Sequence, residues 1–142
     1  MSGRLVIPAH IHEAMVKDCF AGLPNEACGF LGGRDRAVER LYPLTNAAAS
    51  PLIYRPADRE MLEAINDMDD HGVEVVSIYH SHVASRAYPS PTDIREAHYP
   101  DAVYLIVSLE DRENPVARGY LIRKKDWREE AGEVEEVELV IS

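Results

Sequence analysis

The sequence predicts an α/β domain of the α+β type, in which one mixed, curled β-sheet packs against two longer helices. Short apolar runs typical of strands outnumber the helical segments, and two segments carry an apolar stripe several helical turns long. A chain of 142 residues has the usual size of one domain and can bury a hydrophobic core without disulfides. We therefore expect residues 1–142 to form a single domain without linkers or repeats.

The first expected element is a short apolar strand over residues 5–7, which a proline stops. A helix follows, because apolar residues recur every four positions until the chain reaches Gly22. These residues are Ile11, Met15 and Cys19. Residues 28–31 then predict a small buried strand, bounded by a pair of glycines.

Residues 38–44 alternate between apolar and polar side chains, which predicts the next strand. Residues 45–51 are polar or small and predict a loop, and residues 53–55 are expected to pair briefly as a strand. A helix is predicted over residues 58–71, with Gly72 placed as its C′ residue. Its inner face carries Met61, Ile65 and Met68.

Residues 73–79 form an almost continuous apolar strand that delivers two histidines to its carboxyl end. Residues 90–98 predict a short helix. The remaining strands are predicted over residues 103–108, 116–122 and 134–141, the last of them at the surface.

Composition limits the classes of partner. Acidic residues outnumber Lys and Arg by 25 to 15, so the formal charge is −10 and the chain on average repels nucleic acid. The sequence lacks a signal-peptide core and any stretch of the roughly 20 apolar residues that span a bilayer. Cys19 and Cys28 have neither a CxxC spacing nor the density of a disulfide scaffold, so we expect both to be reduced and partly buried. The expected location is the cytoplasm.

A His-x-His motif at the end of the apolar strand predicts a metal site. Along an extended strand His80 and His82 project to the same face, roughly 6.5–7 Å apart, so both rings can reach one ion. Asp93 follows at a short distance and offers a carboxylate. Two histidines and one carboxylate leave one tetrahedral position open, which is typical of a catalytic rather than a structural zinc ion.

The segment that carries this carboxylate has a second interpretation. Residues 90–93 read Ser-Pro-Thr-Asp, and Ser as N-cap, Pro at N1 and an acidic residue at N3 are what a helix start requires whatever the chemistry. The two interpretations are compatible, because a helix N-terminus holds Ser90 and Asp93 rigidly and a metal ligand needs a rigid mount.

The other histidines have ordinary structural interpretations. His10 and His12 also form a His-x-His pair, but they lie at a predicted helix start, where residues two apart do not share a face. His71 and His98 are expected at helix ends, where a cation complements the helix dipole.

Taken together, two motifs resemble the JAMM (MPN+) metalloprotease family. Residues 25–33, NEACGFLGG, match its ExCGxLxG context, and His80-x-His82, Ser90 and Asp93 have the fixed spacing of its metal motif. The resemblance covers essentially the whole chain. It implies a cytidine-deaminase-like MPN/JAB fold in which the short helix carries the metal Asp.

The resemblance implies a role for each matched residue. The expected Zn²⁺ ligands are His80, His82 and Asp93. Glu26 would hold the attacking water, accept its proton and pass that proton to the leaving amine. Ser90 would donate a hydrogen bond to the oxyanion. Cys28 lies two residues beyond Glu26 on the same face of the strand and could be mistaken for a nucleophile or a fourth ligand. We interpret it as a small buried hydrophobe, because a thiolate ligand would close the open position.

The details of residues 79–82 and 87–90 resemble the bacterial stand-alone, Mec-like branch of the family. That branch implies a substrate: a ubiquitin-like sulfur-carrier protein ending in Gly-Gly, from which cysteine is released in cysteine biosynthesis. One departure is Val83, where many eukaryotic members have Pro. This difference argues against a deubiquitinase of the proteasome or signalosome type.

The loop over residues 83–89 is predicted to face the substrate, because it hangs between the metal ligands. Arg86 and Tyr88 are expected to contact an incoming extended peptide. A Gly-Gly tail suits a narrow groove, since glycines allow close backbone approach, and such tails commonly bind by adding a strand to a sheet edge.

Two other functions stay open. Two histidines and a carboxylate also bind Fe(II), as in non-haem iron enzymes of the cupin or facial-triad type, although two clear helices argue against an all-β cupin. A non-catalytic MPN scaffold that only binds partners is the other alternative. Such scaffolds typically lack the ligands that this chain keeps.

Overall fold

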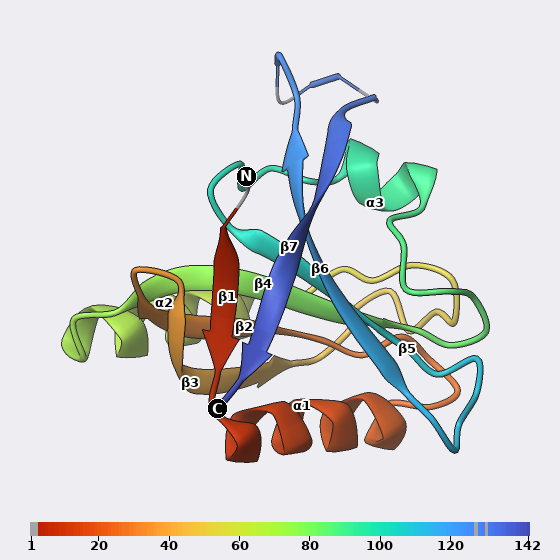
Figure 1. Cartoon of the computed structure of the whole chain (residues 1–142), viewed down its shortest axis with the longest axis horizontal. Coiled ribbons are helices and arrows are strands. Elements are labelled where there is room, and N and C mark those ends of the chain that lie inside the picture. The colour runs from red at the N-terminus through yellow and green to blue at the C-terminus, as the bar shows by residue number, and fades with distance from the viewer. Residues whose placement is uncertain (1–2, 127, 130) are drawn as a thin grey trace.

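The computed structural model describes residues 3–126, 128–129 and 131–142. Over these residues seven strands close into a barrel in the order β1-β3-β2-β4-β5-β6-β7, with the helices around it (Figure 1). The elements are β1 (Arg4–Ile7), α1 (Ala9–Ala21), β2 (Cys28–Arg34), β3 (Ala37–Leu44), α2 (Asp58–Asp70), β4 (Glu74–His82), α3 (Pro91–Arg95), β5 (Val103–Ser108), β6 (Val116–Arg123) and β7 (Glu133–Ile141).

The predicted mixed sheet with two longer helices is confirmed. β1 runs parallel to β3 and β7, and β4 runs parallel to β5, whereas the other neighbouring strands are antiparallel. The sheet closes because β1 pairs with β3 on one side and with β7 on the other. Its β4–β5 pair is parallel, so α3 and the loops before and after it can connect the two strands as a crossover.

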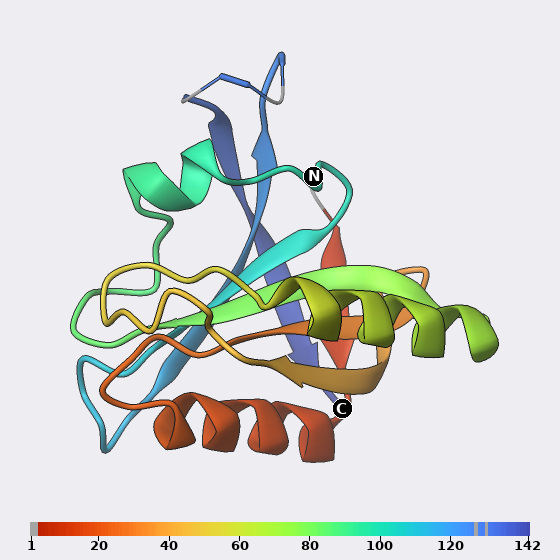
Figure 2. The same ribbon diagram turned by 180° about the vertical axis from the view of Figure 1, so that it is seen from behind.

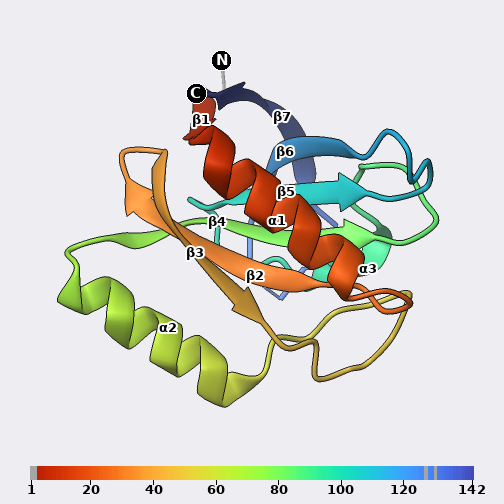
Figure 3. The ribbon, with the colours of Figure 1, turned by 90° about the horizontal axis from the view of Figure 1, so that it is seen from below.

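Alternate residues of β4 belong to two different cores. Tyr79 packs in the cluster that includes the buried face of α1, whereas Ile78 packs in the cluster that includes the buried face of α2. Seen from below, α1 lies across the strands and α2 lies apart from it beside β3 (Figure 3). His80 and His82 share the face of Ile78, because side chains two apart on a strand point the same way.

The strand β2 is longer than predicted. It runs through the Gly32-Gly33 pair that was expected to end it, and its pairing register shifts at these glycines on both sides. A shift of this kind lets a strand bend and continue instead of stopping. At Gly29 a Cβ atom would lie 2.3 Å from the ring of Tyr79, so the glycine of the ExCGxLxG context lets β2 lie against β4 at that point.

Three further expectations needed correction. The strand β4 extends to His82, so both histidines lie within the strand instead of beyond its end. Residues 53–55 form no strand, and the local pairing is a single bridge between Asn46 and Pro56. The helix expected over residues 90–98 ends at Arg95, so His98 lies beyond it.

The ends of the long helices agree with the sequence. α1 ends at Ala21 next to Gly22, and α2 is followed by Gly72 with φ of +67°, the left-handed conformation typical of a C′ glycine. Cys19 and Cys28 are both free, as predicted, and both are completely buried where partial burial was expected. Within the described ranges, no helix has the length and apolar character needed to cross a membrane. That residues 1–142 form one domain stays a prediction.

Candidate metal centre

Three buried side chains converge at the carboxyl end of β4. The Nε2 atoms of His80 and His82 lie 3.2 Å apart, and Oδ2 of Asp93 lies 3.1 Å from the first and 2.9 Å from the second. All three residues are buried, with Asp93 the most exposed at 8%. The spacing in the sequence therefore brought these donors to one point, as predicted.

The arrangement of these donors fits a small cation. Donor atoms bound at about 2.0–2.1 Å to one tetrahedral zinc ion lie about 3.3–3.4 Å from one another. The separations of 2.9–3.2 Å in this cluster are close to those values. The cluster can hold a metal ion, and its two nitrogens and one oxygen suit zinc as well as other borderline divalent metals.

Asp93 is fixed by the start of α3. Its backbone N–H donates to Oγ of Ser90 at 3.0 Å, and its Oδ2 accepts from the backbone N–H of Ser90 at 2.9 Å, which together form a capping box. The predicted helix cap is thus confirmed. Because Ser90 uses its oxygen as an acceptor in this cap, its hydroxyl proton stays available for donation outside the helix.

The two imidazole rings are oriented by different contacts. Nδ1 of His82 lies 2.8 Å from the backbone carbonyl of Arg86, which is the partner expected for a metal-ligating histidine. Nδ1 of His80 is buried without a hydrogen-bond partner among the described residues. Instead the ring of Tyr54 stacks on the His80 ring, with centroids 4.3 Å apart and an interplanar angle of 20°.

Burial and the neighbouring charged groups shift the pKa values of Asp93 and His82. Burial alone would raise the pKa of Asp93, but the hydrogen bonds from His80 and His82 outweigh it and hold that pKa well below its ordinary value. Burial opposes the charged form of His82, whereas Asp93 and the carbonyl of Arg86 favour it, so the pKa of His82 is raised. A carboxylate that stays ionised in a buried site is a suitable ligand for a cation.

Glu26 is placed beside this cluster by the pairing of its neighbour with β4. The backbone N–H of Ala27 donates to Oγ of Ser81 at 2.8 Å, and the N–H of Ser81 donates to the carbonyl of Ala27 at 3.0 Å. Glu26 itself is 5% exposed, and its Oε1 atom has no hydrogen-bond partner among the described residues. A buried, unpaired carboxylate oxygen near three metal-binding groups suits a site that receives a cation and a water.

Burial raises the pKa of Glu26 to about 8, an effect that the charge of His82 opposes and the charge of Asp93 increases. A cation held by the cluster would lower this pKa, because a bound metal ion is the largest local charge in such a site. With a cation in the cluster the ionised form of Glu26 is favoured, and this is the form that a general base requires.

The remaining sequence candidates lie outside the cluster. His10 and His12 lie on α1, and the structure places neither of them in a group of potential ligands among the residues it describes. Nδ1 of His71 lies 2.7 Å from the carbonyl of Asp67 at the end of α2, as its structural interpretation predicted. His98 lies beyond the end of α3 at Arg95, so its expected position at a helix end was wrong.

Cys28 faces the core beside α2, where its Sγ lies 3.7 Å from the carbonyl of Leu44. Burial raises the pKa of this thiol to about 12. A thiol of this kind is a poor nucleophile at neutral pH, and the side chain packs as a small hydrophobe.

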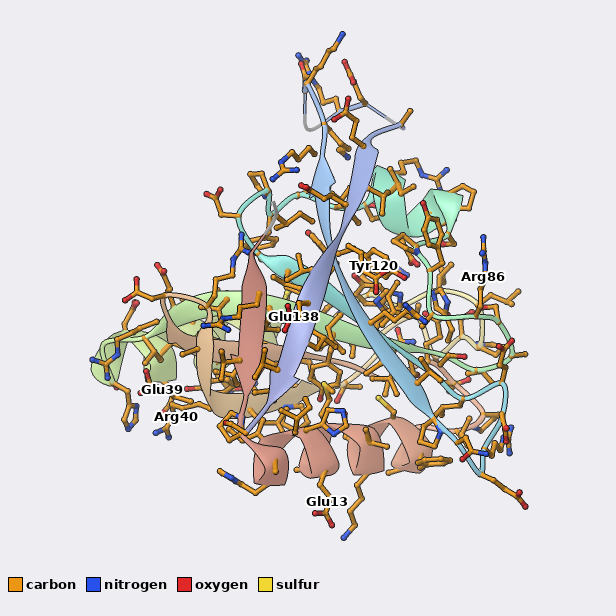
Figure 4. All side chains as sticks on the ribbon, viewed as in Figure 1. Glu13, Glu39, Arg40, Arg86, Tyr120 and Glu138 are labelled. Carbon is orange, nitrogen blue, oxygen red and sulfur yellow. The ribbon has the colours of Figure 1, made fainter. Side chains whose placement is uncertain are left out.

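The loop over residues 83–89 covers the sheet next to the cluster. Arg86 and Tyr88 line a cavity of about 410 Å³ together with residues of β5, β6 and β7. The guanidinium of Arg86 lies 4.9 Å from the centre of the Tyr88 ring, and the hydroxyl of Tyr120 donates to the backbone of the loop. Figure 4 shows Arg86 at the outer edge of the molecule, away from Tyr120. Both predicted contact residues are exposed, but their role in binding a peptide stays a prediction.

Sequence reasoning missed two residues of the site. Tyr54 was assigned to a brief strand, and Ser81 was treated only as the spacer between two histidines. The signal for Tyr54 was the one aromatic residue in a loop of small, aliphatic and polar residues before the helix. Ser81 gave none, because its partner lies 54 positions away in the chain.

Comparison with known proteins gives consistent relationships. The family described as prokaryotic homologs of the JAB domain matches residues 8–123. The chain is 43% identical over 120 residues to the CysO-cysteine peptidase of Mycobacterium tuberculosis, covering 83% of this chain and 82% of that protein. It is 33% identical over 118 residues to the desampylase of Haloferax volcanii, covering 78% and 85%. A probable TtuB-protein conjugate cleaving protease of Thermus thermophilus is 38% identical over 96 residues, covering 67% and 64%.

Solved structures have the same fold. A protein from Desulfitobacterium hafniense superposes with a TM-score of 0.84 at 37% identity, covering 97% of this chain and 92% of that one. A JAB1/MPN domain protein from Archaeoglobus fulgidus superposes with a TM-score of 0.59 at 19% identity, covering 96% and 99%, and supports the fold alone.

Proposed function

The chain belongs to the family of prokaryotic homologs of the JAB domain, and on that premise we propose that it is a zinc-dependent peptidase. Relatives at 33–43% identity that are named as peptidases, desampylases or conjugate-cleaving proteases support a hydrolase. The observation that carries the proposal is the buried cluster of His80, His82 and Asp93, with the buried carboxyl group of Glu26 beside it, whose Oε1 atom has no hydrogen-bond partner in the described part of the chain.

In this proposal each residue has one task. The zinc ion would be held by His80, His82 and Asp93; when bound, it supplies Lewis acidity and lowers the pKa of a water to about 7. Glu26 orients the attacking water, takes its proton and delivers it to the leaving amine. The hydroxyl of Ser90 donates a hydrogen bond to the oxyanion of the tetrahedral intermediate, while its oxygen still accepts the N–H of Asp93 in the cap of α3.

The alternatives have less support. A cupin-like iron enzyme would need a different fold, since the chain matches the JAB-domain family and superposes on a JAB1/MPN domain protein. A non-catalytic scaffold would have no use for a buried base next to three converging ligands. Zinc itself, rather than another divalent metal, stays part of the proposal.

We further propose that the substrate is a ubiquitin-like sulfur-carrier protein ending in Gly-Gly, and that the enzyme hydrolyses the amide between its terminal glycine and an appended cysteine. The 43% identity to a CysO-cysteine peptidase supports this choice. Hydrolysis of conjugates between such a carrier and other proteins is a second candidate, favoured by the relatives named as a desampylase and a TtuB-conjugate protease. Either reaction would take place in the cytoplasm and contribute, in the first case, to cysteine biosynthesis.

The test compares three substrates at equal concentration: the cysteine adduct of the carrier from the same genome, the same carrier joined to a lysine side chain of a protein, and a free tail peptide ending in Gly-Gly-Cys. Mass spectrometry follows the loss of cysteine or of the conjugated protein. We expect the adduct to be cut fastest and the free peptide slowly, because contacts to the folded carrier position the scissile bond. Preference for the lysine conjugate would favour the second candidate, and no cleavage of any substrate by the zinc-loaded protein would reject the peptidase.

A further inference from the structure

The loop between β3 and α2, residues 45–57, lies against the metal cluster. Figure 2 shows this loop in yellow on the same side of the molecule as α3. The ring of Tyr54 stacks on the His80 ring at 4.3 Å, nearly parallel to it. The loop also contacts the segment of the base, since the backbone N–H of Glu26 donates to the carbonyl of Ser50 at 2.9 Å. One loop therefore contacts both sides of the site.

The stacking contact matters because the residues that the structure describes give Nδ1 of His80 no orienting hydrogen bond. A histidine that ligates a metal almost always donates its second ring N–H to a carboxylate, carbonyl or water, which fixes the ring plane. His82 has such a partner in the carbonyl of Arg86. Nδ1 of His80 has none among the described residues, although His80 is fully buried. The stacked face of Tyr54 is a contact that can restrain the plane of this ring in place of such a bond.

Tyr54 is in turn held by Asn46. The Nδ2 atom of Asn46 donates to the carbonyl of Ile53 at 3.0 Å, and its Oδ1 atom accepts from the N–H of Arg55 at 2.9 Å. The residues on both sides of Tyr54 are thus bound by one side-chain amide. The same Nδ2 atom donates to the carbonyl of Glu26 at 3.0 Å. Only an amide can do this, because it presents a donor and an acceptor from one planar group.

We propose that Asn46 and Tyr54 are positioning residues of the active site: Tyr54 sets the ring plane of His80 for metal binding, and Asn46 fixes the distance between that ring and Glu26. This inference rests on the proposed metal-dependent function. It adds two residues that act on the reaction through their neighbours, without touching the metal or the substrate.

The first test removes the aromatic face. Zinc affinity is measured by competition with a chromophoric chelator for the wild type, Tyr54→Leu and the matched control Tyr54→Phe. Loss of an orienting partner typically lowers metal affinity 10- to 100-fold, so we expect a loss of roughly that size for Tyr54→Leu. Tyr54→Phe keeps the ring and is expected to retain the wild-type affinity. Equal affinities for all three, or an equal loss in both variants, would overturn the role of the ring.

A spectroscopic measurement tests the same contact without metal. In the metal-free wild type, the ring protons of His80 should show the upfield NMR shift that a stacked aromatic face produces, and Tyr54→Leu should remove it while the other resonances of β4 stay in place. Absence of this shift in the wild type would contradict the stacking.

The second test concerns Asn46 and stays informative if Tyr54→Leu does not fold. Asn46→Asp replaces the donor by a carboxylate oxygen facing the carbonyls of Glu26 and Ile53. The control Asn114→Asp changes an exposed asparagine of the β5–β6 turn, whose side chain donates to its local neighbour Asp111. We expect Asn46→Asp to lower both the zinc affinity and kcat. KM for the carrier adduct should change by less than about threefold. Asn114→Asp should change neither.

A folded Asn46→Asp protein with wild-type zinc affinity and kcat would overturn the proposal. Zinc affinity and the NMR shift are measured without substrate. A wild-type protein that binds zinc through a Tyr54-dependent site but cuts no carrier conjugate would therefore count against the proposed function and in favour of the positioning role.

Discussion

Ser81→Ala tests the hydrogen bond that holds the backbone next to Glu26, without replacing any of the three metal ligands. Ser81 is fully buried, and its hydroxyl oxygen accepts the N–H of Ala27 at 2.8 Å. Removing the hydroxyl leaves that buried N–H without its partner, which costs about 1–3 kcal/mol of the free energy of unfolding. Glu26 precedes Ala27, so a shift of this backbone also moves the base. A displacement of the order of 1 Å lowers kcat by roughly 10- to 100-fold.

The matched control is Ser77→Ala on the same strand. Ser77 is also fully buried, but its hydroxyl donates to the carbonyl of Val103 at 2.8 Å, on the side away from Glu26. Its loss should cost about 0.5–1.5 kcal/mol and leave kcat unchanged.

Urea unfolding followed by circular dichroism gives the two free energies, and steady-state kinetics on the carrier adduct gives kcat. The reasoning is refuted if Ser81→Ala unfolds within about 0.5 kcal/mol of the wild type, or if Ser77→Ala lowers kcat as much as Ser81→Ala does.

Three further outcomes are expected. Elemental analysis should find about one zinc per wild-type chain and essentially none in His80→Ala or Asp93→Ala; unchanged zinc in both variants would place the metal elsewhere. Glu26→Gln should keep its zinc and its melting temperature but lose turnover by roughly 10²–10⁴-fold, and Ser90→Ala should lose somewhat less; wild-type turnover of Glu26→Gln would remove this residue from the mechanism. Burial raises the pKa of the Cys28 thiol to about 12, so iodoacetamide at about pH 8 should leave Cys28 unmodified in the folded protein. Rapid alkylation of Cys28 with loss of activity would contradict its structural role.

Most elements of the fold could be predicted because their signals are local. Apolar residues four apart defined α1, and the left-handed position after α2 required Gly72. The errors lie where pairing over long distances decides the outcome. The Gly32-Gly33 pair has the composition of a turn, yet β3 and β4 pair with it on both sides and the strand continues. Closure of the barrel depends on β1 meeting both β3 and β7, which no local pattern encodes.

The same distinction explains what could be predicted of the site. His80 and Asp93 are 13 positions apart, and each is placed by a regular element with a clear sequence pattern, a strand for one and a capped helix start for the other. The convergence of the ligands therefore follows from local rules. The hydrogen bond from Ala27, next to Glu26, to the hydroxyl of Ser81 depends on the register of β2 against β4. A shift of one residue in this register would turn the hydroxyl to the other face of the sheet.

The capping box shows why the ligand cluster can be rigid in a small protein. Oδ2 of Asp93 accepts the backbone N–H of Ser90 and also faces both imidazoles, so one oxygen satisfies the helix start and points into the site. The backbone bond removes rotational freedom from the carboxylate before any metal binds, and the entropy of ordering this ligand is lost on folding instead of on binding. His82 is restrained in the same way by the carbonyl of Arg86. Only the third ligand depends on a ring stacked from a distant loop, and for this reason the metal affinity should be most sensitive, outside the ligands themselves, to the residues that hold that loop.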